Sequence, residues 1–297
     1  MAQSEAAFSA SYRFQAIGTQ WQIDTAREID QDTRSALTVV IEDYDRAFSR
    51  FRSDSLVAQA GRYPGVHQLP AAAAELEPVY RALHRLTDGA MTPLVTASLE
   101  HLGYDAGYRL RAAPGFLPAP DWATSIEWQG STLHTKQAVV LDFGAAGKGQ
   151  LVDLLAVVLK EHGFESFIID ASGDLIACGP DSFRVALEHP YDPSSAIGVL
   201  ELGDQALCAS ASNRRAWGDG LHHVLDGTTG KPVQTVVASW ALADAALRAD
   251  ALATALFFTD HETLAEEFDF SSVRLFSDGR AEISANFRGE IFLKGSN

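Results

Sequence analysis

The fold of this chain is organised around the stretch Leu141-Asp142-Phe143-Gly144-Ala145-Ala146-Gly147-Lys148-Gly149, which joins a predicted strand (138–143) to a predicted amphipathic helix (150–162). Its small residues let the backbone approach a ligand closely, and free N–H groups at a helix start attract an anion. Lys148 adds positive charge. Gly149 follows the lysine where a Walker A loop needs Ser or Thr, and the dinucleotide fingerprint is absent as well. The alternative is a tight turn that packs the helix on a sheet.

The elements on either side of this stretch predict an α+β fold. Short strands separated by turns imply antiparallel pairing, and the helices carry apolar residues at helical spacing. Glycine, proline and alanine dominate residues 107–122, which predicts a surface connection. The predicted class is therefore α+β, with mostly antiparallel sheets and packed helices. The predicted strands are 12–25 (bent at Gly18), 166–169, 182–188, 197–202, 206–211, 221–225, 235–242 and a hairpin over 273–287 turning at Asp278-Gly279; the further predicted helices are 32–48, 75–86, 94–102 and 243–258.

The domain organisation is predicted to be simple. No internal repeat, low-complexity tail or linker interrupts the sequence. Residues 1–11 are interpreted as an N-terminal extension and residues 12–297 as a single domain, with two interleaved lobes as the alternative.

The charge of the chain limits its partners. Among 297 residues, 39 Asp and Glu outnumber 23 Lys and Arg, which gives a formal net charge of -16. Nucleic acids and anionic membranes would be repelled, so neither is expected to bind. An anionic cofactor needs a local positive field from a metal ion, a lysine or oriented backbone N–H groups.

The N-terminus and the cysteines bear on location. Residues 1–10 contain Glu5 and no basic segment before an apolar run, which predicts a cytoplasmic protein; an exported form with its leader trimmed away would read the same. No window is long enough to span a membrane. Cys178 and Cys208 lie in apolar strand-like runs, which favours buried thiols over a disulfide framework.

A second segment with chemical character is Leu221-His222-His223-Val224-Leu225-Asp226-Gly227-Thr228-Thr229-Gly230-Lys231-Pro232. A histidine at a strand end can act as a general base near neutral pH, and the turn that follows would hold the strand end in place. Strand alternation puts His222 and His223 on opposite faces, so only one can face a site. The alternative is a surface histidine pair without ligands.

A third segment is Arg248-Ala249-Asp250-Ala251-Leu252-Ala253-Thr254-Ala255-Leu256, inside an apolar helix. Asp250 and Thr254 are four residues apart and share a face, and two hard oxygen donors in apolar surroundings are costly unless something satisfies them. Magnesium prefers a carboxylate together with further oxygens and phosphate. The alternative is internal pairing, in which Thr254 bonds the carbonyl of Asp250 and Asp250 meets a lysine.

Taken in order, these segments resemble the ApbE-type family of FAD:protein FMN transferases, from about Tyr12 to the end of the chain. No single motif is decisive, but the ordered set is specific. The matching stretches are Ala16-Ile17-Gly18-Thr19, Phe48-Ser49-Arg50-Phe51 through Ser55, Asp88-Gly89-Ala90-Met91-Thr92-Pro93, Asp142 through Lys148-Gly149 with Val152-Asp153, Ser172-Gly173-Asp174, Ala209-Ser210-Ala211-Ser212, His223-Val224-Leu225-Asp226 with Thr229-Gly230-Lys231-Pro232, and Asp250 to Thr254.

The resemblance implies the members of a flavin site. It implies that FAD lies with its pyrophosphate near Mg²⁺, held by the Asp250 carboxylate, the Thr254 hydroxyl and the Ala145 backbone carbonyl. His223 matches the histidine that activates the acceptor hydroxyl. The remaining flavin-site candidates are Ile17, Phe51, Ala90, Met91, Thr92, Asp142, Lys148 and Leu225.

The resemblance also implies a reaction, in which FMN moves from FAD to a Thr or Ser hydroxyl of an acceptor protein and AMP leaves. The family's acceptors resemble Asp-x-x-Ser/Thr-Gly-Ala-Ser/Thr, and no such segment occurs here, so the acceptor is another chain. A magnesium-dependent FAD pyrophosphatase that gives FMN and AMP, and a non-catalytic FAD-binding protein, are the alternatives. The chain departs from the family pattern mainly in the pocket lining, at Ile17, Met91-Thr92, Ser172, Ser210-Ala211-Ser212 and Gly227.

Overall fold

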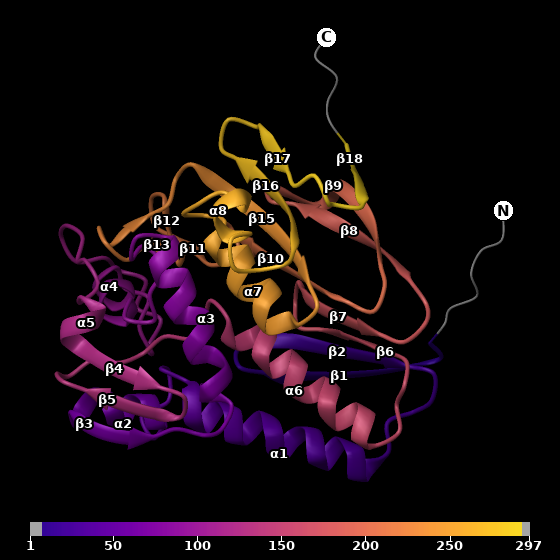
Figure 1. Cartoon of the computed structure of the whole chain (residues 1–297), viewed down its shortest axis with the longest axis horizontal. Helices are drawn as coiled ribbons and strands as arrows, with labels where there is room; N and C mark the ends of the chain where they lie inside the picture. Colours follow the sequence, from indigo (N-terminus) through magenta and orange to yellow (C-terminus); the bar gives the residue numbers. More distant parts are fainter. Residues whose placement is uncertain (1–7, 293–297) are drawn as a thin grey trace.

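An eight-stranded sheet forms the centre of the molecule (Figure 1). The computed structural model describes residues 8–292. The strand order is β1-β2-β6-β7-β10-β15-β16-β17, and each pairing within this sheet is antiparallel. The strands are β1 (Ala10–Ala16), β2 (Thr19–Thr25), β6 (Phe167–Asp170), β7 (Asp174–Cys178), β10 (Ala206–Ala211), β15 (Val236–Ala243), β16 (Ser271–Phe276) and β17 (Ala281–Ile283).

Smaller sheets and eight helices surround the main sheet in the described part of the chain. The helices are α1 (Gln31–Phe48), α2 (Leu56–Arg62), α3 (Ala73–Leu86), α4 (Thr96–His101), α5 (Trp122–Ser125), α6 (Gly147–Glu161), α7 (Ala246–Ala255) and α8 (His261–Leu264). The smaller sheets are formed by β3 (Gly65–Gln68), β5 (Thr132–Thr135) and β4 (Ile126–Gln129); by β18 (Gly289–Ile291), β9 (Asp192–Leu202) and β8 (Phe183–His189); by β11 (Ala216–Trp217) and β12 (Leu221–His222); and by β13 (Leu225–Asp226) and β14 (Lys231–Pro232).

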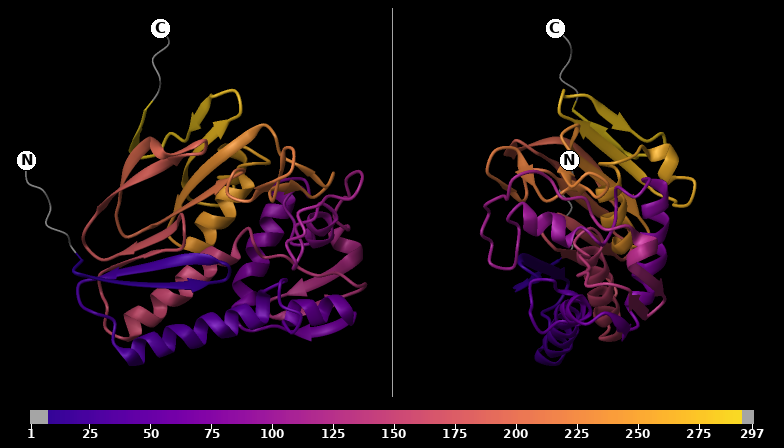
Figure 2. Two further views of the ribbon diagram at one scale, coloured as in Figure 1. Left: turned by 180° about the vertical axis from the view of Figure 1, so that it is seen from behind. Right: turned by 90° about the vertical axis from the view of Figure 1, so that its left-hand side faces the viewer.

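The main sheet is covered on both faces, which explains its apolar strands. All eight residues of β15 are buried. Ala241 and Ala243 belong to the large core cluster that includes α6 and α7, whereas Trp240 and Leu242 belong to a second cluster with β8 and β9. Alternate side chains of one strand therefore serve two different cores. Figure 2 shows the arrangement from behind, with β1 and β2 lying in front of α6.

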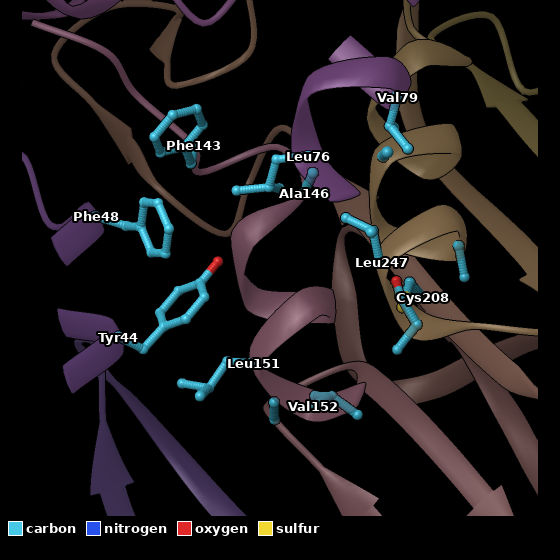
Figure 3. Packing of buried hydrophobic residues seen from close by; sticks show 14 of the residues in the cluster. Tyr44, Phe48, Leu76, Val79, Phe143, Ala146, Leu151, Val152, Cys208 and Leu247 are labelled. Carbon is cyan, nitrogen blue, oxygen red and sulfur yellow. The ribbon is translucent and has the colours of Figure 1, made fainter. Parts of the chain in front are cut away.

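Helix α6 is the centre of the larger core. Figure 3 shows it between Tyr44 and Phe48 of α1 on one side and Leu247 of α7 on the other. The Tyr44 hydroxyl donates to Gln150 Oε1 of α6 over 3.1 Å, so even the polar tip of this buried ring is satisfied. The last three residues of the 141–149 stretch are the first residues of α6, so this core fixes where the stretch lies.

The α+β class with mostly antiparallel sheets and packed helices is confirmed. Helical spacing located α1, α3 and α6 to within a few residues, and the 107–122 stretch contains no strand and is largely exposed. The hairpin turning at Asp278-Gly279 joins β16 to β17. Cys178 and Cys208 are free and buried. The helix predicted over 243–258 is shorter at both ends: Ala243 belongs to β15, α7 begins at Ala246, and it ends at Ala255.

The predicted bent strand over residues 12–25 is wrong, because the chain reverses there. Strands β1 and β2 pair along their length with Ala16 opposite Thr19, so Ile17-Gly18 is a two-residue hairpin loop. Both loop residues have positive φ, 41° and 80°, as this tight reversal requires. A β-branched side chain in that region is strained, and strain of this kind concentrates at functional sites.

The predicted strand over 138–143 is also wrong. Val139, Leu141 and Phe143 are buried in alternation, yet the segment pairs with no strand. It runs among helices, and its backbone is held at Asp142, whose N–H donates to the Pro93 carbonyl over 2.7 Å. The alternating apolar residues correctly predicted which side chains are buried. Burial of alternate side chains, however, does not require the backbone to pair with a neighbouring strand. The predicted strand 221–225 likewise forms only the two-residue pieces β12 and β13.

Two further expectations concern the ends and the membrane. Residues 1–7 of the predicted N-terminal extension lie outside the described residues, and Ala10 and Ser11 belong to β1. The assignment of residues 12–297 to one domain stays a prediction. Within residues 8–292, no helix combines the length and the apolar character needed to cross a bilayer.

Gly149 allows α6 and α7 to approach each other closely. A Cβ at this position would lie 2.1 Å from the Ala246 carbonyl oxygen and 2.7 Å from Asp250 Cβ. Gly149→Ala is therefore expected to lower the free energy of unfolding by about 1–3 kcal/mol, as overpacking against backbone does. Chemical denaturation measures this. Gly203→Ala is the control, because nothing lies within 4 Å of a Cβ there; equal losses in both variants would contradict the close approach.

Candidate functional site

The predicted site segments converge at one end of the main sheet. The hairpin loop Ile17-Gly18 lies beside the loop between β6 and β7, whose Ser172-Gly173 residues also have positive φ. Ser172 Oγ donates to the Gln20 carbonyl over 2.7 Å and joins the two loops. The start of α6, the face of α7 and the end of β10 complete this region.

Asp250 and Thr254 lie on the buried side of α7, towards α6 and β10. Asp250 is 4% exposed, and its Oδ2 accepts the Gly149 N–H over 2.9 Å. Thr254 Oγ1 lies 3.0 Å from Ser210 Oγ of β10. Among the described residues no hydrogen bond joins the Asp250 and Thr254 side chains; their hydrogen-bond partners come from α6 and β10. Both side chains are oriented by neighbouring elements, and their remaining lone pairs are free to bind a ligand.

Asp153 fixes the start of α7. Its two carboxylate oxygens accept the N–H groups of Ala246 and Leu247, each over 2.8 Å. These are N–H groups that a helix start leaves unpaired, and a carboxylate also suits the positive end of the helix. Burial nevertheless raises the pKa of Asp153 to about 6. The last aspartate of the 142–153 motif therefore positions the helix that carries Asp250.

Lys148 is held by an internal partner. Its Nζ lies 2.6 Å from Asp174 Oδ2 and donates to the Ala171 carbonyl over 3.1 Å. Asp174 is fully buried. Burial alone would lower the pKa of Lys148, but the Asp174 and Asp250 carboxylates raise it above the ordinary value. The lysine is charged, yet most of its charge is neutralised inside the protein.

The hydrogen bonds and positive charges around the Asp250 carboxyl group do not fully offset the cost of burying its negative charge. Burial and the Asp174 carboxylate raise the pKa of Asp250 to about 8, against the lowering effects of Lys148, the Gly149 N–H and Arg215. Two buried carboxylates share one lysine. A cation in contact with Asp250 would supply the missing positive charge.

The donor set fits magnesium. Asp250, Thr254 and the Ala145 carbonyl offer oxygen ligands only, which is the chemistry that Mg²⁺ prefers, with phosphate and water completing its shell. Residues 8–292 contain no cluster of three or more His, Cys, Asp or Glu side chains, as a zinc or iron site would present. The residues present therefore match a hard cation that shares its ligands with a phosphate.

Asp142 and Phe51 meet through an arginine that sequence reasoning did not single out. Arg50 Nε lies 2.5 Å from Asp142 Oδ2, and Asp142 Oδ1 accepts the Gly144 N–H over 2.6 Å. The Arg50 guanidinium also lies over the Phe51 ring, 4.1 Å from its centroid. Phe51 in turn stacks on Tyr108, with centroids 5.5 Å apart and an interplanar angle of 4°. The Asp142 carboxylate thus organises the aromatic side of the site.

The 90–92 segment and Leu225 are joined to the same region. The Gly227 N–H donates to the Ala90 carbonyl over 2.8 Å, so the turn after β13 lies against this segment. Met91, Thr92 and Leu225 are buried, and Leu225 belongs to the apolar cluster that Phe51 contacts. A Cβ at Gly227 would lie 2.6 Å from Thr92 Cγ2 and 3.0 Å from the Ala90 carbonyl oxygen, so this close approach disfavours any larger residue, proline included.

The two adjacent histidines differ sharply. His222 is buried and internally satisfied: its Nε2 donates to the Val233 carbonyl over 2.8 Å, and its Nδ1 accepts the Val224 N–H over 3.3 Å. His223 is half-buried, and its Nδ1 is enclosed without a hydrogen-bond partner. Burial, with the charges of Arg215 and His222, lowers the pKa of His223 to about 3, so its ring is neutral at physiological pH. His223 is the histidine with an unused ring nitrogen.

Arg50, Asp174 and Asp153 are the residues that the sequence-based site omitted. Asp174 and Asp153 carry a signal, since each lies within a stretch that resembles a family motif. Arg50 lies within such a stretch too, but nothing in the sequence pairs it with Asp142, 92 positions away. Contacts of this range are set by the fold.

Breaking the Arg50–Asp142 pair is expected to be costly. The two side chains are 2% and 14% exposed, so Arg50→Met would leave a buried carboxylate without its partner, a change that typically lowers the free energy of unfolding by about 3–5 kcal/mol. Denaturant unfolding measures it. Arg46→Met is the matched control, because Arg46 pairs with Asp43 at an exposed position. A loss no larger than that of the control would show that Asp142 is hydrated instead.

The fold and the site together define an α+β protein with a buried carboxylate and a half-buried hydroxyl on α7, and a half-buried histidine next to β12. The model of the ApbE family matches residues 17–271, and the chain belongs to that family. The FAD:protein FMN transferase of Vibrio cholerae is 28% identical over 240 residues, 75% of this chain and 72% of that protein. The FAD:protein FMN transferase of Salmonella typhimurium is 23% identical over 270 residues, 81% and 75% of the two chains.

Solved structures show the same fold. The ApbE protein of Thermotoga maritima matches with a TM-score of 0.80 at 23% identity, over 94% of this chain and 97% of that one. The flavin transferase ApbE of Vibrio cholerae matches with a TM-score of 0.78 at 21% identity, over 94% and 98%. The resemblance inferred from the ordered motifs is therefore confirmed at the level of family and fold.

Proposed function

We propose that this chain is a magnesium-dependent FAD:protein FMN transferase, an enzyme that moves FMN from FAD to a Thr or Ser hydroxyl of an acceptor protein and releases AMP. The observation that supports the proposal is the pair of oxygen donors Asp250 and Thr254 on one face of α7, in a chain whose relatives are named for this transfer. The acceptor is a separate flavoprotein with a segment like Asp-x-x-Ser/Thr-Gly-Ala-Ser/Thr.

The residues of the chain divide the work between binding and proton transfer. Asp250, Thr254 and the Ala145 carbonyl would hold Mg²⁺, which when bound neutralises charge on the pyrophosphate. The remaining candidates surround the isoalloxazine and the ribityl chain: Ile17, Phe51, Ala90, Met91, Thr92, Asp142 and Leu225. Lys148 serves this site chiefly by anchoring the β6–β7 loop through Asp174 and Ala171.

The chemical step is a displacement at the flavin-side phosphorus. The acceptor hydroxyl oxygen forms a new bond to phosphorus, the bond to the bridging oxygen breaks, and AMP departs with that electron pair. His223, whose lowered pKa leaves its ring neutral, takes the hydroxyl proton on a ring nitrogen. An acceptor hydroxyl aligned with the phosphorus supplies the orientation that the step needs.

Incubation with FAD and Mg²⁺ separates this function from its alternatives. The protein is incubated with and without a peptide that carries the acceptor motif, and the peptide mass and released AMP are measured. Peptide that gains FMN supports transfer. AMP released equally without peptide supports the FAD pyrophosphatase, and bound FAD with neither product supports a non-catalytic flavin-binding protein.

A further inference from the structure

Arg215 lies opposite His223 in the β11–β12 ladder. These strands pair antiparallel, with Ala216 opposite His222 and Trp217 opposite Leu221. One step further along the same register brings Arg215 opposite His223, and the Arg215 backbone lies close enough to the His223 ring to affect its pKa. The fold thus sets a permanent positive charge beside the histidine with the unused nitrogen.

The Arg215 side chain has no internal partner. Every other arginine within residues 8–292 is either exposed or makes an ion pair or hydrogen bond through its side chain, whereas half-buried Arg215 does neither. Acidic residues outnumber basic ones by 39 to 23, so pairing would be the ordinary outcome. No Arg215 nitrogen is among the buried atoms without a partner, so its guanidinium keeps contact with solvent and its donors are available to a ligand.

The charge of Arg215 reaches the centre of the site. It adds to the lowering of the His223 pKa that burial causes, and it opposes the rise that burial causes in the pKa of Tyr104, in the aromatic cluster around Phe51. Arg215 therefore lies near both the proposed proton acceptor and the aromatic side of the site. An anion bound between those elements would be within its reach.

An anionic ligand at this site needs a positively charged partner. From the sequence, Lys148 and the N–H groups at the start of α6 were predicted to attract the anion. Lys148 is neutralised by Asp174 at 2.6 Å, and the Gly147 and Gly149 N–H groups are taken by the Phe143 carbonyl and Asp250. These groups therefore offer little to an anionic ligand in a protein of charge -16.

We propose that Arg215 binds the flavin-side phosphate of FAD. This inference rests on the proposed function and deepens it. The guanidinium offers several N–H donors in a planar fork that matches phosphate oxygens, and it stays charged at every physiological pH. It would hold the phosphorus beside His223 and neutralise charge that builds up as the acceptor oxygen attacks.

The test measures FAD affinity in the presence of Mg²⁺ for the parent, Arg215→Gln and Arg215→Lys. Arg215→Gln should weaken FAD binding about ten- to a hundredfold, the size of a lost charge-assisted hydrogen bond. Arg215→Lys should retain part of the affinity, and added guanidinium should restore part of the loss in Arg215→Gln. The matched control is Arg214→Gln, because the neighbouring Arg214 is exposed and pairs with Glu188 at 3.1 Å.

The outcomes decide the role of Arg215 separately from the reaction. Parent-like affinity in Arg215→Gln would overturn the inference, and so would a loss that neither lysine nor guanidinium restores, since that indicates a structural role. If the parent binds FAD but never transfers FMN to an acceptor, the proposed function fails, while the four affinities still decide whether Arg215 binds the phosphate.

Discussion

Asp250→Asn is expected to abolish magnesium-dependent FMN transfer while making the metal-free protein more stable near neutral pH. Asn keeps the shape of the side chain and its acceptor for the Gly149 N–H, but it removes the charge that would hold a cation. Asn also removes the cost of keeping the buried carboxyl protonated at a pH where the unfolded chain would ionise it. Activity and metal-free stability should therefore move in opposite directions.

The pH dependence of this effect follows from the raised pKa of Asp250. The pKa is about 8 in the folded protein and 3.8 in an ordinary aspartate, so between these values the unfolded chain gives up its proton while the metal-free folded protein keeps it. The contribution of this group to stability is fully present below pH 3.8 and is lost as the pH rises towards about 8. The stability advantage of Asp250→Asn should grow across that window.

Thermal unfolding with a chelator, at both ends of the window, measures the stability change, and single-turnover transfer with Mg²⁺ measures the activity. Thr254→Val is the companion variant, and it should lose less activity, since a neutral hydroxyl is the weaker ligand and the shape is kept. Parent-like turnover in Asp250→Asn would refute the metal assignment. Equal activity losses in both variants would indicate a structural role for this face of α7.

His223→Gln is expected to lose FMN transfer by about a hundred- to ten-thousandfold, the usual contribution of a general base. FAD binding should persist, because the proposed role lies in activating the acceptor. Gln offers an amide in place of the unpartnered Nδ1 and cannot take the proton. Single-turnover transfer and FAD affinity, measured on the same preparation, separate the two roles.

His222→Gln is the control, and the structure changes what it should show. His222 is buried with both ring nitrogens bonded, so its replacement should lower stability. The transfer rate per folded molecule should stay close to the parent. A normal rate in His223→Gln, or a larger loss of rate in His222→Gln, would mean that the wrong histidine was chosen.

The helices and the site segments were predictable because they are local. Helical spacing depends on which side chains share a face within a few turns, and α1, α3 and α6 follow it. Several of the ordered motifs lie in turns or at a helix start, where the local shape depends on the segment's own residues. The family, the α+β class and the candidate ligands Asp250 and Thr254 could be read from this information.

The errors occurred where a local pattern had more than one tertiary outcome. Residues 12–25 alternate as one strand would, but positive φ at Ile17 and Gly18 turns them into a hairpin. Residues 138–143 alternate in burial as a strand does, yet they pass among helices. Alternating hydrophobicity predicts which side chains are buried. It does not predict which segment the backbone pairs with by hydrogen bonds.

The sequence by itself determined the family, the class of fold and the residue types that can hold a cation and take a proton. Only the tertiary structure decided which charged side chains form ion pairs with each other. Lys148 is neutralised by Asp174, Asp142 is held by Arg50, and Arg215 is left without a partner beside His223. The physical reason is that electrostatic energies in a buried site depend on distances of a few ångströms between residues far apart in the chain, and only the packing of α6, α7 and the main sheet fixes those distances.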